Sequence, residues 1–173
     1  MLTMRSLTLP ASTLMVQYAA YHRDRRNIAT HLVGIPLIFL SIALFLVQPL
    51  AGGLTWAWGM WLLTSLWYLS RGELLLCGAT ALVNGLLVAL AHGLAPQATA
   101  WGLAPWQLAL VLFVVGWAFQ FVGHYWEGRK PAFVDDIVGL LVGPMFVVGE
   151  VLMVAGLLGG LRLQIEAEVG STR

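Results

Sequence analysis

The sequence predicts an all-α membrane protein, a polytopic bundle of four to five transmembrane helices with a short interfacial helix before them. Of its 173 residues, 60% are hydrophobic and only 10% are charged, whereas an ordinary soluble domain carries about 25% charged residues. Apolar runs of roughly 18 or more residues recur, and each can cross a bilayer core of about 30 Å. We therefore interpret residues 1–173 as a single integral membrane domain, with its core at 14–161 and a loose polar tail at 162–173.

The composition also excludes several functions. The formal net charge is +1, and no basic surface interleaved with aromatic residues suggests a nucleic-acid partner. The single cysteine, Cys77, excludes an internal disulfide and a cysteine-based metal cluster. We expect no secretory signal peptide, because Pro10 breaks the weakly apolar stretch near the N-terminus. The expected partner is membrane lipid, and no pattern indicates the number of subunits.

The helices are expected in the following order. Residues 7–21 carry apolar side chains at helical spacing, which favours a short amphipathic helix lying in the membrane interface. Asn27 is the expected N-cap of the first span, and Pro36 is expected to kink that span. Four membrane spans are predicted, at residues 28–50, 54–69, 73–94 and 106–126. The stretch 95–105 contains two prolines and is predicted to be a loop.

A last apolar segment, residues 137–161, either spans the membrane or re-enters it. Because proline suits the first turn of a helix, Pro144 predicts a helix that begins near Gly143. Lys and Arg gather on the cytoplasmic side of membrane proteins, and a cytoplasmic N-terminus places seven of the nine there. The exceptions, Arg162 and Arg173, also conform if the last segment is re-entrant.

This topology places three of the four histidines at one membrane level. His22, His31 and His124 lie at the cytoplasmic face, and His92 lies near the opposite face. His22 and His31 are nine residues apart, about half a turn around a continuous helix, so a break between them is needed before both can face one ion. Three histidines at one depth could hold Fe(II) or Zn(II) and leave positions open, although histidines alone do not choose between these metals. The alternative is a set of interfacial histidines without a metal.

Other polar residues are candidates for the surroundings of such an ion. Gln120 and Glu127 share a helix face with His124, and Asn27 shares a face with His31. Glu150 lies inside an apolar segment, so it should point into the protein, where it could meet Gln120. The candidates for orienting a histidine or serving as a fourth ligand are Asn27, Gln120, Glu127, Glu150 and His92. Three cations, Arg26, Arg129 and Lys130, are first contacts for lipid headgroups and could also receive a substrate carboxylate.

The pattern of these residues resembles a known family. The matching pieces are Tyr21-His22 with Asn27 and His31, the run GWAFQFVGH at 116–124, the run EGRKPA at 127–132, and Pro144 followed six residues later by Glu150. Over about residues 14–160 the chain is similar to the 2-hydroxy fatty acid dioxygenases, small multi-span membrane proteins of fatty-acid α-oxidation with a member in yeast.

The resemblance implies an Fe(II)-dependent dioxygenase that uses O2 to shorten a long-chain 2-hydroxy fatty acid by one carbon. It also implies that His22, His31 and His124 are the metal ligands and the catalytic residues. Two alternatives stay open, a zinc-dependent membrane hydrolase with the same ligands and a non-enzymatic membrane scaffold. A di-iron desaturase is excluded because it would need about twice as many histidines.

Overall fold

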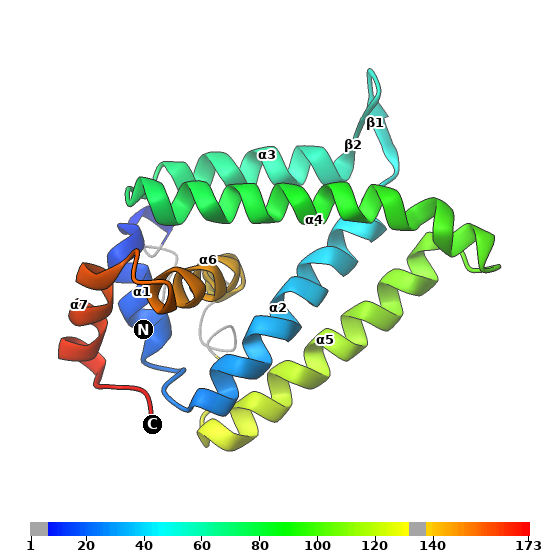
Figure 1. The fold of residues 1–173 in the computed structure, drawn as a ribbon. Helices are drawn as coiled ribbons and strands as arrows, with labels where there is room; N and C mark the ends of the chain where they lie inside the picture. The colour runs from blue at the N-terminus through cyan, green and yellow to red at the C-terminus, as the bar shows by residue number, and fades with distance from the viewer. Residues whose placement is uncertain (1–6, 132–137) are drawn as a thin grey trace.

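The computed structural model describes residues 7–131 and 138–173. The regular structure within these residues is helical apart from one short hairpin, which confirms the all-α class (Figure 1). The helices are α1 (Ala11–Ala19), α2 (Arg25–Phe45), α3 (Trp56–Leu69), α4 (Leu74–Ala100), α5 (Pro105–Glu127), α6 (Val138–Val154) and α7 (Gly159–Val169). The hairpin strands are β1 (Pro49–Ala51) and β2 (Leu54–Thr55).

Two helix pairs and three shorter helices make up the fold. The helices α2 and α5 run side by side. The helices α3 and α4 form a second pair, which crosses the first pair where α2 ends and α5 begins (Figure 1). The helix α6 packs against α2 and α4, and α1 and α7 lie against each other at the end of the molecule where α2 begins. This arrangement places the start of α2 beside the end of α5, where the predicted site residues lie.

In the described part of the chain, three helices are long and apolar enough to cross a membrane, namely α2, α4 and α5. The helices α6 and α7 together meet the same criterion, but they meet at an angle of 111°. A bent pair of this kind is either a broken span or a re-entrant segment, the two alternatives expected from the sequence. The helix α3 has 14 residues and is about 21 Å long, shorter than a bilayer core of about 30 Å.

Several predicted helix boundaries are wrong. The N-cap of α2 is Asp24, whose carboxylate accepts a hydrogen bond from the N–H of Arg26 at 2.8 Å, and Asn27 lies inside the helix. The first span ends at Phe45, before the hairpin, and α4 continues through Pro96 into the predicted loop.

The helix α6 is already formed at Val138, so Pro144 lies in its interior. Apolar membrane helices tolerate an internal proline because neighbouring groups satisfy the freed backbone. Asp135 and Asp136, which come shortly before this helix in the sequence, lie outside the described residues.

Both ends of the described chain pack more closely against the rest of the molecule than the sequence predicts. The helix α1 is largely buried against α6 and α7 instead of presenting one face to solvent or lipid. The predicted loose tail forms α7, which buries Leu161 and Ile165. Arg173 then pairs with the start of α2 and the connection before it: its N–H donates to the carbonyl of Arg23 at 2.9 Å, and the N–H of Arg25 donates to the carbonyl of Arg173 at 3.0 Å.

Glycines allow α2 and α5 to touch backbone to backbone. A Cβ atom added to Gly116 would lie 2.7 Å from Cγ1 of Ile38 and 2.9 Å from the carbonyl oxygen of Gly34. A Cβ atom on Gly123 would overlap the Thr30 hydroxyl and the Asn27 amide. Small residues at such crossings are typical of packed membrane helices. The close approach brings His31 on α2 next to Gln120 and His124 on α5.

Replacing Gly116 with alanine is therefore expected to lower stability by about 1–3 kcal/mol, because the added methyl group must push two packed helices apart. The measurement is the thermal unfolding midpoint in detergent. Gly93→Ala is the matched control, because a Cβ atom at Gly93 in α4 would meet nothing within 4 Å. Equal midpoints for the two variants would show that the crossing is not tightly packed.

Candidate metal centre

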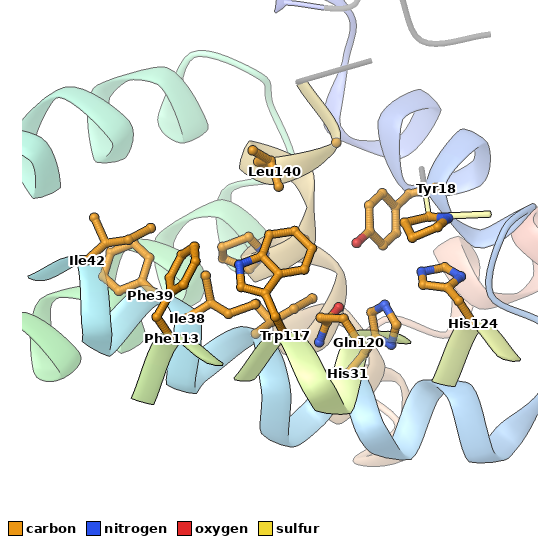
Figure 2. Close-up of a pocket in the computed structure, with 15 residues that line it drawn as sticks. Tyr18, His31, Ile38, Phe39, Ile42, Phe113, Trp117, Gln120, His124 and Leu140 are labelled. Atoms are coloured by element: carbon orange, nitrogen blue, oxygen red, sulfur yellow. The ribbon is translucent and has the colours of Figure 1, made fainter. Parts of the chain in front are cut away.

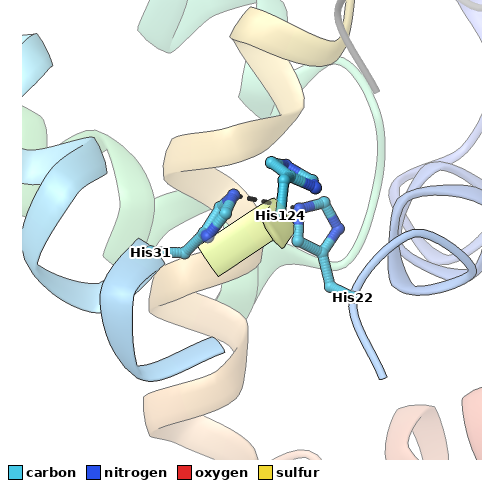
Figure 3. A group of neighbouring side chains, drawn as sticks. All are labelled: His22, His31 and His124. Atoms are coloured by element: carbon cyan, nitrogen blue, oxygen red, sulfur yellow. Dashed lines mark hydrogen bonds between the residues drawn. The ribbon is translucent and has the colours of Figure 1, made fainter. Parts of the chain in front are cut away.

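Three buried histidines from three different elements converge in the structure (Figure 3). His22 lies in the connection between α1 and α2, His31 lies in the second turn of α2, and His124 lies in the last turn of α5. One ring nitrogen from each lies within 4.8 Å of the others. The break between α1 and α2 is what lets His22 and His31 face each other, so the expected break and the expected convergence are both present.

The hydrogen bonds of two of these histidines fix their tautomers. The Nδ1 atom of His22 lies 2.8 Å from the carbonyl oxygen of Tyr18, and the Nδ1 atom of His31 lies 2.9 Å from that of Asn27. A carbonyl oxygen only accepts, so each Nδ1 atom carries the hydrogen and each Nε2 atom presents a lone pair. The two Nε2 atoms are 3.0 Å apart. Facing lone pairs repel each other unless a cation or a shared proton lies between them.

This geometry fits a transition-metal ion. Histidine nitrogens lie about 2.0–2.1 Å from zinc, which places two nitrogens on one ion roughly 3 Å apart, and iron is of similar size. Backbone carbonyls that accept from the Nδ1 hydrogens orient the rings as outer partners of metal-binding histidines do. The third histidine, His124, has a buried Nδ1 atom with no hydrogen-bond partner among the described residues. The donor set is therefore three imidazoles, two of them already turned toward a common point.

The surroundings of His22 keep its ring neutral. The ring of Tyr18 stacks on it at 4.3 Å with an interplanar angle of 7°, and Phe146 packs at 5.1 Å. Burial, and to a smaller extent the neighbouring His31, lowers the pKa of His22 well below its ordinary value. A neutral imidazole is the form that binds a metal. Sequence reasoning missed Tyr18, although its place one helical turn before His22 was a visible signal.

Glu127 anchors the connection that carries His22. Its Oε2 atom accepts hydrogen bonds from the backbone N–H of Arg23 at 2.9 Å, the backbone N–H of Asp24 at 2.8 Å and the Nδ2 amide of Asn27 at 3.0 Å. Its side chain is 1% exposed, and its Oε1 atom lies 3.6 Å from the guanidinium of Arg173. In this structure Glu127 binds the 23–27 segment and is not a member of the histidine group.

An apolar cavity of about 190 Å³ opens from the histidines (Figure 2). His31, His124 and Gln120 lie at one end of it, and apolar side chains of α2, α5 and α6 line the rest. The Nε2 atom of Gln120 is buried and has no hydrogen-bond partner among the described residues. Leaving such a donor unsatisfied costs about 1–3 kcal/mol. The cavity therefore combines a polar end suited to a polar group with a long apolar remainder.

Two of the other candidates lie away from the histidines. Glu150 lines a separate polar cavity of about 300 Å³ together with Arg23, Arg162 and Glu166, so it does not share a cavity with Gln120. His92 lies between α3 and α4, where its Nε2 atom is 3.0 Å from the Thr55 hydroxyl and its ring stacks on Trp58.

The three candidate cations lie near the ends of α2 and α5 that carry the site. Arg26 is exposed, forms an ion pair with Asp24 at 2.7 Å and lies over the ring of Trp126. Arg129 donates to the carbonyl oxygen of Ala20 at 2.7 Å. Lys130 is exposed and directly precedes Pro131, a residue of the cavity wall.

Comparison with known proteins supplies the family. A family model described as 2-hydroxy-palmitic acid dioxygenase Mpo1-like matches residues 10–155. The chain is 30% identical over 155 residues to the 2-hydroxy-palmitic acid dioxygenase MPO1 of Saccharomyces cerevisiae, and the alignment covers 88% of this chain and 85% of the yeast protein. No solved structure matches the chain. The matched region contains all three converging histidines, and the chain belongs to the Mpo1-like family of 2-hydroxy-palmitic acid dioxygenases.

Proposed function

We propose that this protein is an Fe(II)-dependent membrane dioxygenase that shortens long-chain 2-hydroxy fatty acids by one carbon with O2 as co-substrate. His22, His31 and His124 would hold the iron. The observation that carries the proposal is the buried pair of Nε2 atoms 3.0 Å apart, with both Nδ1 hydrogens engaged on backbone carbonyls. The name of the yeast relative supports both the reaction type and the substrate class.

Each part of the site has a task in this proposal. Iron supplies the redox chemistry with O2 that side chains lack, and three protein ligands leave positions open for other groups. The Gln120 side chain lies at the polar end of the cavity with His31 and His124, and in this proposal its amide contacts the carboxylate or hydroxyl of the acid. The apolar lining excludes water and holds the acyl chain. The carbonyl of Asn27 and the carboxylate of Glu127 keep His31 and the His22 segment in place.

We further propose that the metal centre lies at the cytoplasmic face, because Lys and Arg cluster at the ends of α2 and α5 beside it. Arg26, Arg129 and Lys130 would attract the carboxylate as the substrate approaches. Arg129 and Lys130 directly precede the cavity residue Pro131, so they lie close to one of its walls.

The test is metal analysis of detergent-purified wild-type protein, combined with an assay of 2-hydroxy fatty acid and O2. We expect about one iron per chain and a product one carbon shorter, with O2 consumed. One zinc per chain, together with hydrolysis that does not depend on O2, would indicate a membrane hydrolase instead. A folded protein that binds no added metal would indicate a scaffold.

Replacing Gln120 with leucine is expected to lower kcat/KM by about 10- to 100-fold, because a hydrogen bond to a charged group contributes about 1.5–3 kcal/mol. Iron content should stay near the wild-type value, because the variant keeps all three histidines of the group. Steady-state kinetics and metal analysis of the same preparation check both expectations. Unchanged kinetics would remove Gln120 from substrate binding.

A further inference from the structure

The histidine cavity ends at two side chains that it shares with a second cavity. Ile42 on α2 and Phe113 on α5 line the end farthest from the histidines (Figure 2). The same two residues line a neighbouring cavity of about 340 Å³, which continues along α2 and α5 past Phe45 to Trp106. Ile42 and Phe113 therefore stand as a partition between two apolar spaces that follow one helix pair.

The occupant that fits these spaces is an unbranched amphiphile with one polar head. The side chains of His124 and Gln120, each with an unpartnered nitrogen, lie at one end of the first cavity. In the second cavity the Ser41 hydroxyl is already engaged, because it donates to the carbonyl of Ile38 at 2.7 Å. A polar head at the histidines and a hydrocarbon chain directed toward Phe113 would match both ends.

The distance along α2 sets a length for that chain. Ile42 lies 11 residues after His31, which corresponds to about 16 Å of helix. A zigzag hydrocarbon chain with bonds of about 1.5 Å advances by roughly 1.3 Å per carbon, so about 12 or 13 carbons fit between the head and the partition. With the two carbons of the 2-hydroxycarboxylate head, the whole acid would have about 14 or 15 carbons. Phe45 lies three residues farther, or about 4.5 Å, which would add about three or four carbons.

We propose that Ile42 and Phe113 set the maximum acyl chain length that the site accepts. The inference rests on the proposed function for the position of the polar head at the histidines. A chain longer than the first cavity must push into the partition, and overpacking of this kind weakens affinity by roughly 5- to 100-fold. Removing the partition joins the two cavities and gives the extra carbons a place to lie.

The experiment uses a photoreactive 2-hydroxy fatty acid with a diazirine near its terminal methyl group, bound to the full-length protein in detergent. Unlabelled 2-hydroxy fatty acids of increasing length compete with it, and peptide mapping locates the label. In the wild type we expect labelling near Ile42 and Phe113 and a fall in competition beyond the predicted length. In Ile42→Ala, Phe113→Ala and the double variant, the limit should move up by three or four carbons. Val114→Ala, at an exposed position on α5, is the control that should keep the wild-type limit.

The binding readout separates this inference from the proposed function. Labelling at the partition and a shifted limit without any turnover would uphold the length limit and reject the oxygenase. Turnover with the same length limit in all variants would reject the partition and leave the oxygenase standing. Label found only outside α2 and α5 in the wild type would overturn the inference even if the variants failed to fold.

Discussion

Alanine at His22, His31 or His124 is expected to abolish metal binding and turnover, each falling by at least about 100-fold. Loss of a residue that only hydrogen-bonds to a metal-binding histidine lowers metal affinity or activity by about 10- to 100-fold. Loss of the ligand itself should lower them further. The three ring nitrogens lie within 4.8 Å of one another, so removing any ring leaves two donors at a buried site. Metal content and product formation in the same detergent preparation measure the effect.

His92→Ala is the matched control, because this fourth histidine contacts Thr55 and Trp58 and lies outside the group. It should keep its metal and its activity within about twofold. A His92 variant that lost the metal, or a His22 variant that kept it, would falsify the proposed ligand set. The thermal unfolding midpoint of each variant, measured beside its metal content, separates loss of a ligand from loss of the fold.

Alanine at Glu127 is expected to cause the largest loss of stability, several kcal/mol. The substitution leaves three buried donors without their acceptor, the N–H groups of Arg23 and Asp24 and the amide of Asn27. Each orphaned donor costs about 1–3 kcal/mol, and breaking a buried charged network typically costs about 3–5 kcal/mol in total. The connection that carries His22 would also lose its anchor, so metal binding should weaken along with the fold.

The thermal unfolding midpoint in detergent tests this prediction, with Glu166→Ala as its control. Glu166 forms an ion pair with Arg162 at 2.9 Å, and because both side chains are partly exposed the pair contributes little to stability. Glu127→Gln should fall between the two, because it keeps one acceptor oxygen. If Glu127→Ala unfolded at the wild-type temperature, the carboxylate would not be anchoring the connection between α1 and α2.

Much of the candidate site could be predicted because it depends on local patterns. The run of charged residues between His22 and His31 predicted a break, and the apolar spans predicted that His31 and His124 lie at one depth. The N-cap of α2 was predicted at the wrong residue, because Asp24 and Asn27 are both good capping residues. Glu127, about a hundred residues away, decides between them, because its carboxylate accepts a hydrogen bond from the Asn27 amide.

The C-terminal part also shows where local sequence patterns stop predicting the structure. Leu161 and Ile165, one turn apart, form the apolar stripe of α7, but two buried positions among polar neighbours are too weak a signal to outweigh a polar composition. Glu150 is half-buried beside Arg23, and which neighbours it meets depends on how α6 is rotated. Helix rotation is a matter of tertiary packing, which a single apolar segment with little periodicity does not encode.

The separation of the three histidines along the chain has a consequence for biogenesis. His22 and His31 are made early, but 93 residues separate His31 from His124. At about 5–20 residues per second, the ribosome needs on the order of 5 to 20 s to make that interval. The first two rings can pair while α2 is being inserted, yet the third arrives only when α5 has entered the membrane and reached the glycines of α2. Acquisition of the metal would therefore mark the arrival of α5 in the membrane, and a nascent chain stalled before α5 could not retain it.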